Sequence, residues 1–164
     1  MKSADILQLD RAVHTLIQQG VVNEITAALG VELEQSSLPF VGRSLPAESL
    51  SDPLPSEIRS SWIFRLRGGV WSGCHYHPNS IQHMVAVDGT GLARVGGVES
   101  PIVPIGEPGV EAEQRWFVIP AGVGHDFRPD GESLTVVSFH TCDTDELEEI
   151  DCASGSSRIY EPPR

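Results

Sequence analysis

The stretch from Gly69 to Gly89, GVWSGCHYHPNSIQHMVAVDG, contains two histidines separated by one residue, His75 and His77. On a β-strand, residues i and i+2 point to the same side, so both imidazoles are expected to face one way. Each imidazole has a ring N–H and a ring nitrogen that need partners, which suits an apolar core poorly and a metal ion well. By itself, however, such a pair more often marks half-exposed histidines on an edge strand.

Short strands separated by turn residues are predicted around this stretch. The segment SWIFRLR at 61–67 alternates in side-chain character, which predicts a half-buried strand. Asp88-Gly89 is a strong turn signal. Further strands are predicted over 81–88, 91–95, 115–119 and 134–140. Because no helix is expected between them, the series indicates an all-β fold, an antiparallel sandwich or barrel.

The spacing of this stretch, together with a second one further along, resembles that of the cupin superfamily. The first cupin motif, G-x5-H-x-H-x(3,4)-E-x6-G, is matched at Gly69, His75, His77 and Gly89, with Gln82 where the family has its glutamate. The second motif, G-x5-P-x-G-x2-H-x3-N, is matched at Pro120, Gly122 and His125, with Gln114 and Pro129 replacing its glycine and asparagine. The resemblance covers residues 61–140 and implies a cupin jelly-roll barrel.

The resemblance also implies one divalent metal ion held by His75, His77, His125 and Gln82. Iron(II) is favoured, with zinc, nickel or manganese as alternatives. An amide at position 82 leaves the metal with two positive charges instead of one and is a weaker ligand than a carboxylate. Gln82 is therefore the candidate catalytic residue, either coordinating weakly or hydrogen-bonding a metal-bound water or substrate. No further cofactor-binding residue is predicted.

The function implied is oxidation of a small anionic or chelating organic molecule by an iron(II) dioxygenase-type cupin. Such sites leave open positions for substrate and dioxygen. Two alternatives stay open, because one fold serves many chemistries. One is a metal-dependent isomerase or lyase, and the other is a non-catalytic cupin that binds a small molecule.

No metal-ligand role is assigned to the other residues near the motifs. His83 alternates with Gln82 and is expected to face away from the metal. His140 ends a predicted strand and either enters the barrel or marks the exit of that strand into solvent, and the second alternative is favoured. A solvated outer stripe is expected at Arg65 and Arg67. We expect Cys74 and Tyr76 to face outward without a functional role, and Trp71 and Met84 to be packing residues.

The chain divides by composition into four segments. Residues 1–35 form an N-terminal helical segment, with one helix over 4–19, capped by Ser3 and stopped by Gly20, and another over 23–29, ended by Gly30. Residues 36–60 are a Pro/Ser-rich connection without strand or helix periodicity. Residues 61–142 are the barrel, and 143–164 an acidic C-terminal surface extension.

Composition narrows the partners and the compartment. The 164 residues carry a formal net charge of -12, and Lys2 is the only lysine. Nucleic acid and anionic membranes are therefore not expected as partners. The start of the chain lacks the apolar stretch of a secretion signal, and the three cysteines form neither a CxxC pair nor an even set. We expect a cytoplasmic protein without disulfides, a small-molecule substrate and a homodimer.

Overall fold

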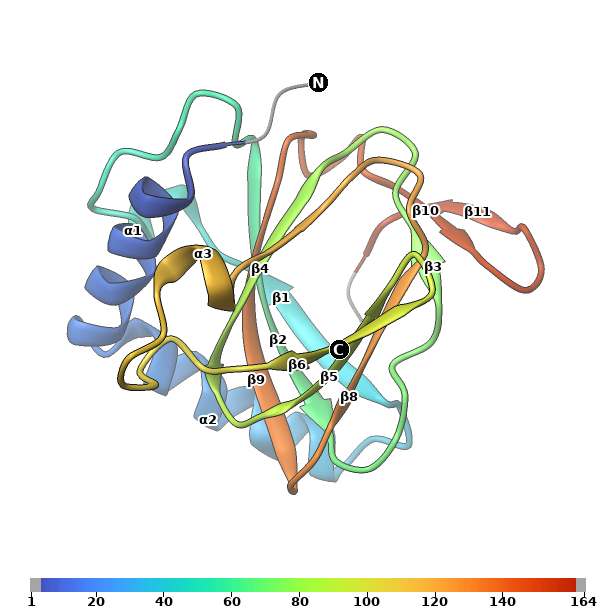
Figure 1. The fold of residues 1–164 in the computed structure, drawn as a ribbon, viewed down its shortest axis with the longest axis horizontal. Coiled ribbons are helices and arrows are strands. Elements are labelled where there is room, and N and C mark those ends of the chain that lie inside the picture. The colour runs from blue at the N-terminus through green and yellow to red at the C-terminus, as the bar shows by residue number, and fades with distance from the viewer. Residues whose placement is uncertain (1–3, 162–164) are drawn as a thin grey trace.

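Two antiparallel sheets make up most of the molecule (Figure 1). The computed structural model describes residues 4–161. Its helices are α1 (Ile6–Gln18), α2 (Val21–Glu34) and α3 (Ala112–Arg115), with one 3-10 turn, η1 (Ala47–Ser49). Its strands are β1 (Phe40–Ser44), β2 (Ser60–Arg67), β3 (His75–Tyr76), β4 (Gln82–Asp88), β5 (Gly91–Val95), β6 (Val98–Ile102), β7 (Phe117–Ile119), β8 (His125–Pro129), β9 (Ser133–His140), β10 (Glu148–Asp151) and β11 (Ser157–Ile159).

The strand order agrees with the antiparallel sandwich expected from the spacing of the strands. One sheet has five strands in the order β1-β2-β9-β4-β7, and the other has six in the order β11-β10-β3-β8-β5-β6. Every pairing between these strands is antiparallel. Side chains from both sheets meet in one apolar cluster, as Met84 from β4 and Phe127 from β8 illustrate. The sheets therefore enclose the interior of a barrel.

The five-stranded sheet is buried on both of its faces. Trp62 and Phe64 on β2 point into the barrel, whereas Ile63 between them belongs to a second cluster with the helices. The prediction of a half-buried strand at 61–67 is therefore wrong, because α1 and α2 cover the outer face. This helical layer lies on the opposite side of the barrel from β10 and β11 (Figure 1).

The helices start and end partly as the sequence predicts. Asp5 caps α1, its carboxylate accepting from the backbone N–H groups of Leu7 and Gln8, and the predicted cap Ser3 lies outside the described residues. Gly20, in the left-handed region at φ 79°, separates α1 from α2 as expected. Gly30 does not end α2, because packing on β1 and β2 carries the helix on to Glu34. None of the helices within 4–161 is long and apolar enough to cross a membrane.

Two segments that were expected to be irregular contain strands. In the connection over 36–60, β1 pairs with β2 along its whole length. In the acidic tail, β10 and β11 form a hairpin that extends the six-stranded sheet through β3. The expectation of a surface extension from residue 143 is wrong, since Leu147 and Tyr160 are buried.

The two departures from the second cupin motif have local structural roles. Gln114 lies in α3, a short helix that was not expected, and its side-chain oxygen accepts from the backbone N–H of Glu111 at 3.1 Å. This contact is half of a capping box, which a glycine could not form. Pro129 ends β8 opposite Gly91 on β5. Neither position lines the pocket described below.

Candidate metal site

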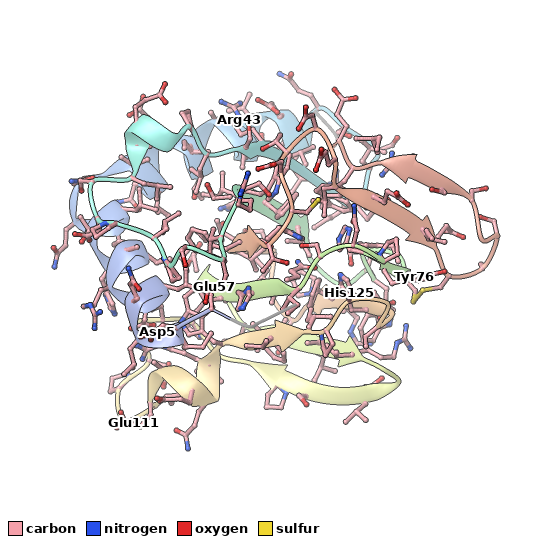
Figure 2. All side chains as sticks on the ribbon, turned by 90° about the horizontal axis from the view of Figure 1, so that it is seen from above. Asp5, Arg43, Glu57, Tyr76, Glu111 and His125 are labelled. Atoms are coloured by element: carbon pink, nitrogen blue, oxygen red, sulfur yellow. A yellow bond between two sulfur atoms is a disulfide. The ribbon has the colours of Figure 1, made fainter. Side chains whose placement is uncertain are left out.

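Three histidines from the two motifs lie together in the barrel. His75 and His77 come from β3 and the residue after it, and His125 begins β8, where it pairs directly with His75. One ring nitrogen from each lies within 4.8 Å of the other two. Figure 2 shows His125 among the strands in the interior, and Tyr76 near the periphery. Such a cluster suggests a site for a divalent metal.

Backbone carbonyls fix the orientation of all three rings. The Nδ1–H of His77 donates to the carbonyl of Glu148 at 2.7 Å, that of His125 to Val123 at 3.0 Å, and that of His75 to Gly73 at 3.1 Å. A carbonyl can only accept, so in the neutral ring each Nε2 keeps its lone pair for a metal. This arrangement of an outer partner on one nitrogen is typical of metal-binding histidines.

Burial favours the neutral form of two histidines of the cluster, His77 and His125. Desolvation, followed by the charge of His75, lowers the pKa of His77 from 6.5 to about 4. The same two causes hold the pKa of His125 well below its ordinary value. The Nε2 of His125 is buried and has no hydrogen-bond partner in the structure. A buried lone pair without a partner is costly, and a metal ion would satisfy it, so these residues fit the divalent ion that the fold implies.

A chain of hydrogen bonds runs from Gln82 to His140. The amide of Gln82 donates to Ser138 Oγ at 3.1 Å, and Ser138 Oγ lies 3.2 Å from His140 Nε2. His140 Nδ1 lies 3.2 Å from Ser80 Oγ. The expectation that His140 leaves into solvent is wrong, because its side chain is 1% exposed and its ring centroid lies 5.0 Å from that of His77. Alternation on β9 could not show which end of the barrel this residue enters.

A mainly apolar pocket adjoins the histidine cluster. It encloses about 350 Å3 of empty space including its mouth. Gln82 and His75 lie on its wall, and the side-chain oxygen of Gln82 is buried without a partner. The other lining residues are Phe40, Phe64, Leu66, Ser72, Met84, Phe127, Val136 and Tyr160. Met84, assigned to packing from the sequence, is therefore also a wall residue.

The C-terminal tail contributes two residues that the sequence reasoning missed. Tyr160 is 6% exposed and its ring lies 5.3 Å from that of His77. Glu149 is 8% exposed, and its Oε2 lies 3.8 Å from His75 Nε2. Burial raises the pKa of Tyr160 well above its usual value, and the charge of Glu149 acts in the same direction. No motif marks either residue, because only the pairing of β10 with β3 brings the tail to the barrel.

Three other predicted outer residues lie on the helix side of the sheet. The Nε2 of His83 accepts from the backbone N–H of Ala4 at 3.0 Å, so His83 faces away from the cluster as alternation predicts. Arg67 donates to the backbone carbonyls of Leu33 and Ser36 at the end of α2, both at 2.6 Å. Arg65 donates to Thr135. Both guanidinium groups are partly buried under α2, and they do not form a solvated stripe.

A disulfide joins Cys74 to Cys152, and Cys142 is the free cysteine. The expectation of a chain without disulfides is therefore wrong, and Cys74 has a partner where none was expected. The bond links the residue before His75 to the end of β10, and it lies near Tyr76 at the periphery (Figure 2). The sequence did not indicate this pair, because Cys74 and Cys152 are 78 residues apart and an odd number of cysteines does not show which two are bonded.

Comparison with known proteins finds structures of similar fold but no match in sequence. No family description and no curated protein matches the chain. A salicylate 1,2-dioxygenase variant from Pseudoaminobacter salicylatoxidans, in complex with gentisate, matches with TM-score 0.57 and 13% identity over 79% of this chain and 34% of that one. Procruciferin, an 11S globulin from Brassica napus, matches with TM-score 0.54 and 13% identity over 72% and 29%.

A third match is the cupin domain of Schizosaccharomyces pombe Cnp3, with TM-score 0.49 and 14% identity over 66% of this chain and 68% of that one. The chain thus spans about a third of the dioxygenase and less of the globulin. At these sequence identities the matches support the fold alone. The two antiparallel sheets agree with these matches, and the positions of the histidines agree with the two cupin motifs, so we conclude that this chain has the cupin jelly-roll fold.

Proposed function

We propose that the protein is a metal-dependent oxidoreductase that acts on a small anionic or chelating organic molecule, with iron(II) as its metal and dioxygen as co-substrate. The observation that carries the proposal is the buried, unpartnered Nε2 of His125 beside His75 and His77, next to a pocket. His75, His77 and His125 would hold the ion, with Gln82 as a further candidate. A bound iron(II) ion supplies redox chemistry that the side chains lack.

The pocket determines what kind of molecule can enter. Its mainly apolar wall, including Phe64 and Phe127, favours an apolar body on the molecule that binds there. Neutral histidines leave the charge of a divalent ion undiminished, which favours an anionic group on the substrate. Gln82 Oε1 has no partner, so it is placed to accept a hydrogen bond from a substrate hydroxyl.

The chain of hydrogen bonds behind Gln82 keeps that oxygen facing the pocket. Ser80 Oγ donates to the Ile81 carbonyl and therefore accepts from His140 Nδ1–H. His140 Nε2 then accepts from Ser138 Oγ–H, and the Ser138 oxygen accepts from the Gln82 amide. Because the amide nitrogen is used in this way, the amide oxygen is the atom left for the substrate.

The test combines metal analysis with oxygen consumption. Freshly purified protein is analysed for its metal, and iron(II)-loaded protein is screened in an oxygen electrode against aromatic acids, diketones and small thiols. We expect iron as the native metal and oxygen uptake that depends on the substrate. His77→Ala should lose this oxygen uptake, and His83→Ala should retain it. Zinc or nickel without oxygen uptake would instead indicate the isomerase or lyase class, and a metal-free native protein the binding module.

A further inference from the structure

We propose that Glu149, on β10, supplies a carboxylate ligand to the metal of the histidine cluster. The inference rests on the proposed metal-dependent function and names a residue outside both motifs. Position 82, where cupins have a glutamate, is glutamine in this chain. Glu149 approaches the same site from a different strand, in the six-stranded sheet.

The strand register places Glu149 on the same face as the histidines. β10 pairs with β3 so that Ile150 is opposite Tyr76 and Asp151 is opposite His75. Continuing this register by one residue brings Glu149 opposite His77, and residues directly opposite each other share a face of the sheet. The carbonyl of the neighbouring Glu148 accepts from His77 Nδ1, so the two segments are held together at this point.

One oxygen of Glu149 is fixed and the other is free. Oε1 accepts from Nε and Nη2 of Arg158, at 3.0 and 2.8 Å. Oε2 is buried and has no hydrogen-bond partner. Burying an unpaired carboxylate oxygen is unfavourable unless a cation completes it. The other carboxylate on this face, that of Asp151, is exposed and accepts from the backbone N–H of Ser154.

The free oxygen faces a free nitrogen. His75 Nδ1–H donates to the carbonyl of Gly73, so Nε2 of the neutral ring is an acceptor. Glu149 Oε2, also an acceptor, lies 3.8 Å from it. Two acceptors facing each other repel unless a cation lies between them, and 3.8 Å is too long for a shared proton. Ligand atoms each about 2.1 Å from one metal ion lie at most about 4.2 Å apart, so the separation of these two atoms allows one ion to be shared by His75 and Glu149. The ligand atoms that already lie within 4.8 Å of one another are those of the three histidines, and Glu149 approaches them from the side of His75.

Arg158 makes the carboxylate compatible with an anionic substrate. Its guanidinium offsets the negative charge of Glu149, so the site with a divalent ion keeps two net positive charges. The side chain of Gln82 is hydrogen-bonded to Ser138, whose hydroxyl carries no charge that would offset a carboxylate at position 82. The chain therefore gains a hard oxygen ligand while its site still attracts anions.

The decisive experiment measures zinc(II) affinity of the full-length, disulfide-intact protein by competition with a chelator. Glu149→Gln removes the charge with little change of shape, and we expect its dissociation constant to rise roughly 10–100-fold, at least the effect of losing an outer-shell partner. Glu99→Gln is the matched control, because Glu99 is an exposed glutamate on β6 of the same sheet, and we expect its affinity to equal that of the wild type. Equal affinities for Glu149→Gln and wild type would overturn the assignment.

A crystal structure of the zinc-loaded wild type gives a second measurement that does not depend on the variant folding. We expect Glu149 Oε2 within about 2.0–2.2 Å of the ion, and an Oε2 beyond about 3 Å would refute the assignment. If Glu149→Gln binds zinc as wild type does, this inference fails and the proposed function stands. If the wild type binds neither zinc nor iron(II), the proposed function fails and this inference fails with it.

Discussion

The buried histidines of the sheets differ in the face of the sheet on which each lies. His75, His77 and His125 each place one ring nitrogen within 4.8 Å of the other two, and the Nδ1 of each ring is bonded to a backbone carbonyl. His83 is as deeply buried, yet it accepts from Ala4 on the helix side. Burial alone therefore does not distinguish a metal ligand from a structural histidine in this protein.

Alanine substitution should separate these two kinds of histidine. We expect His77→Ala or His125→Ala to lose metal affinity by at least roughly 10–100-fold, because each removes a direct ligand. His83→Ala should cost about 1–3 kcal/mol of unfolding free energy, because it leaves a buried N–H unpaired, and should keep its metal. The measurement is metal content of the folded variants after gel filtration. Comparable metal loss in His83→Ala would mean that the register of β4 is misassigned.

Gln82→Glu tests whether glutamine is an adaptation of the site. The variant adds a negative charge beside the metal, so metal affinity should rise or stay the same. Binding of an anionic substrate should weaken, because the net charge of the site falls, and turnover should fall with it. Substrate KM and kcat of the fully metallated variant give the answer. Clearly higher turnover would indicate that the wild-type site is a weakened one and would favour a binding module.

At the scale of the elements, the β10–β11 hairpin is the part of the fold that depends most on a covalent link. It pairs with β3 at only two positions, and the disulfide between Cys74 and Cys152 ties its end to the start of that strand. The hairpin carries Glu149 beside the histidines and leads to Tyr160 in the pocket. Its attachment therefore controls one wall of the site.

Opening the disulfide should lower stability without unfolding the protein. The two cysteines are 78 residues apart, and closing a loop of that size stabilises a fold by roughly 2–4 kcal/mol. We expect dithiothreitol or Cys152→Ser to lower the urea midpoint, and dithiothreitol to have no further effect on Cys152→Ser. Thiol labelling of the denatured chain should find Cys142 alone before reduction. Labelling of all three cysteines before reduction would contradict the bond.

At the scale of the whole molecule, several neutral imidazoles are buried at once. Burial is the main cause that lowers the pKa of His77 to about 4, and it also lowers the pKa of His83, His125 and His140. In the unfolded chain these groups take up protons near pH 6.5. Below that pH the unfolded state binds more protons than the folded state, so stability falls as the pH falls.

The metal-free protein should therefore lose stability from about pH 6.5 downward, and the contribution of His77 should be exhausted below about pH 4. For His77 alone the loss is about 3 kcal/mol. Urea unfolding at a series of pH values measures it. His140→Asn should reduce the slope, because burial lowers the pKa of His140 well below its ordinary value. A flat stability profile between pH 7 and 5 would contradict the buried neutral histidines.

The amino-acid sequence by itself determined the barrel and the three histidines. The alternation of side chains along a strand is a local pattern of a few residues. It therefore predicted β2, β4, β5 and β9, and the faces on which Gln82 and His83 lie. The two motifs placed His75, His77 and His125 near one another, and the structure brings their ring nitrogens together. Whether they bind iron is a prediction that metal analysis will test.

Only the tertiary structure decided the features that depend on long-range pairing. Helix packing carried α2 through Gly30 and buried the outer face of β2. The register of β10 against β3 brought Glu149 and the partner of Cys74 to the site from a tail that looked like a surface extension. Local patterns cannot show such contacts, because the partners are far apart in sequence, more than 70 positions for β10 and β3, and their pairing is decided by which surfaces the whole chain can bury together.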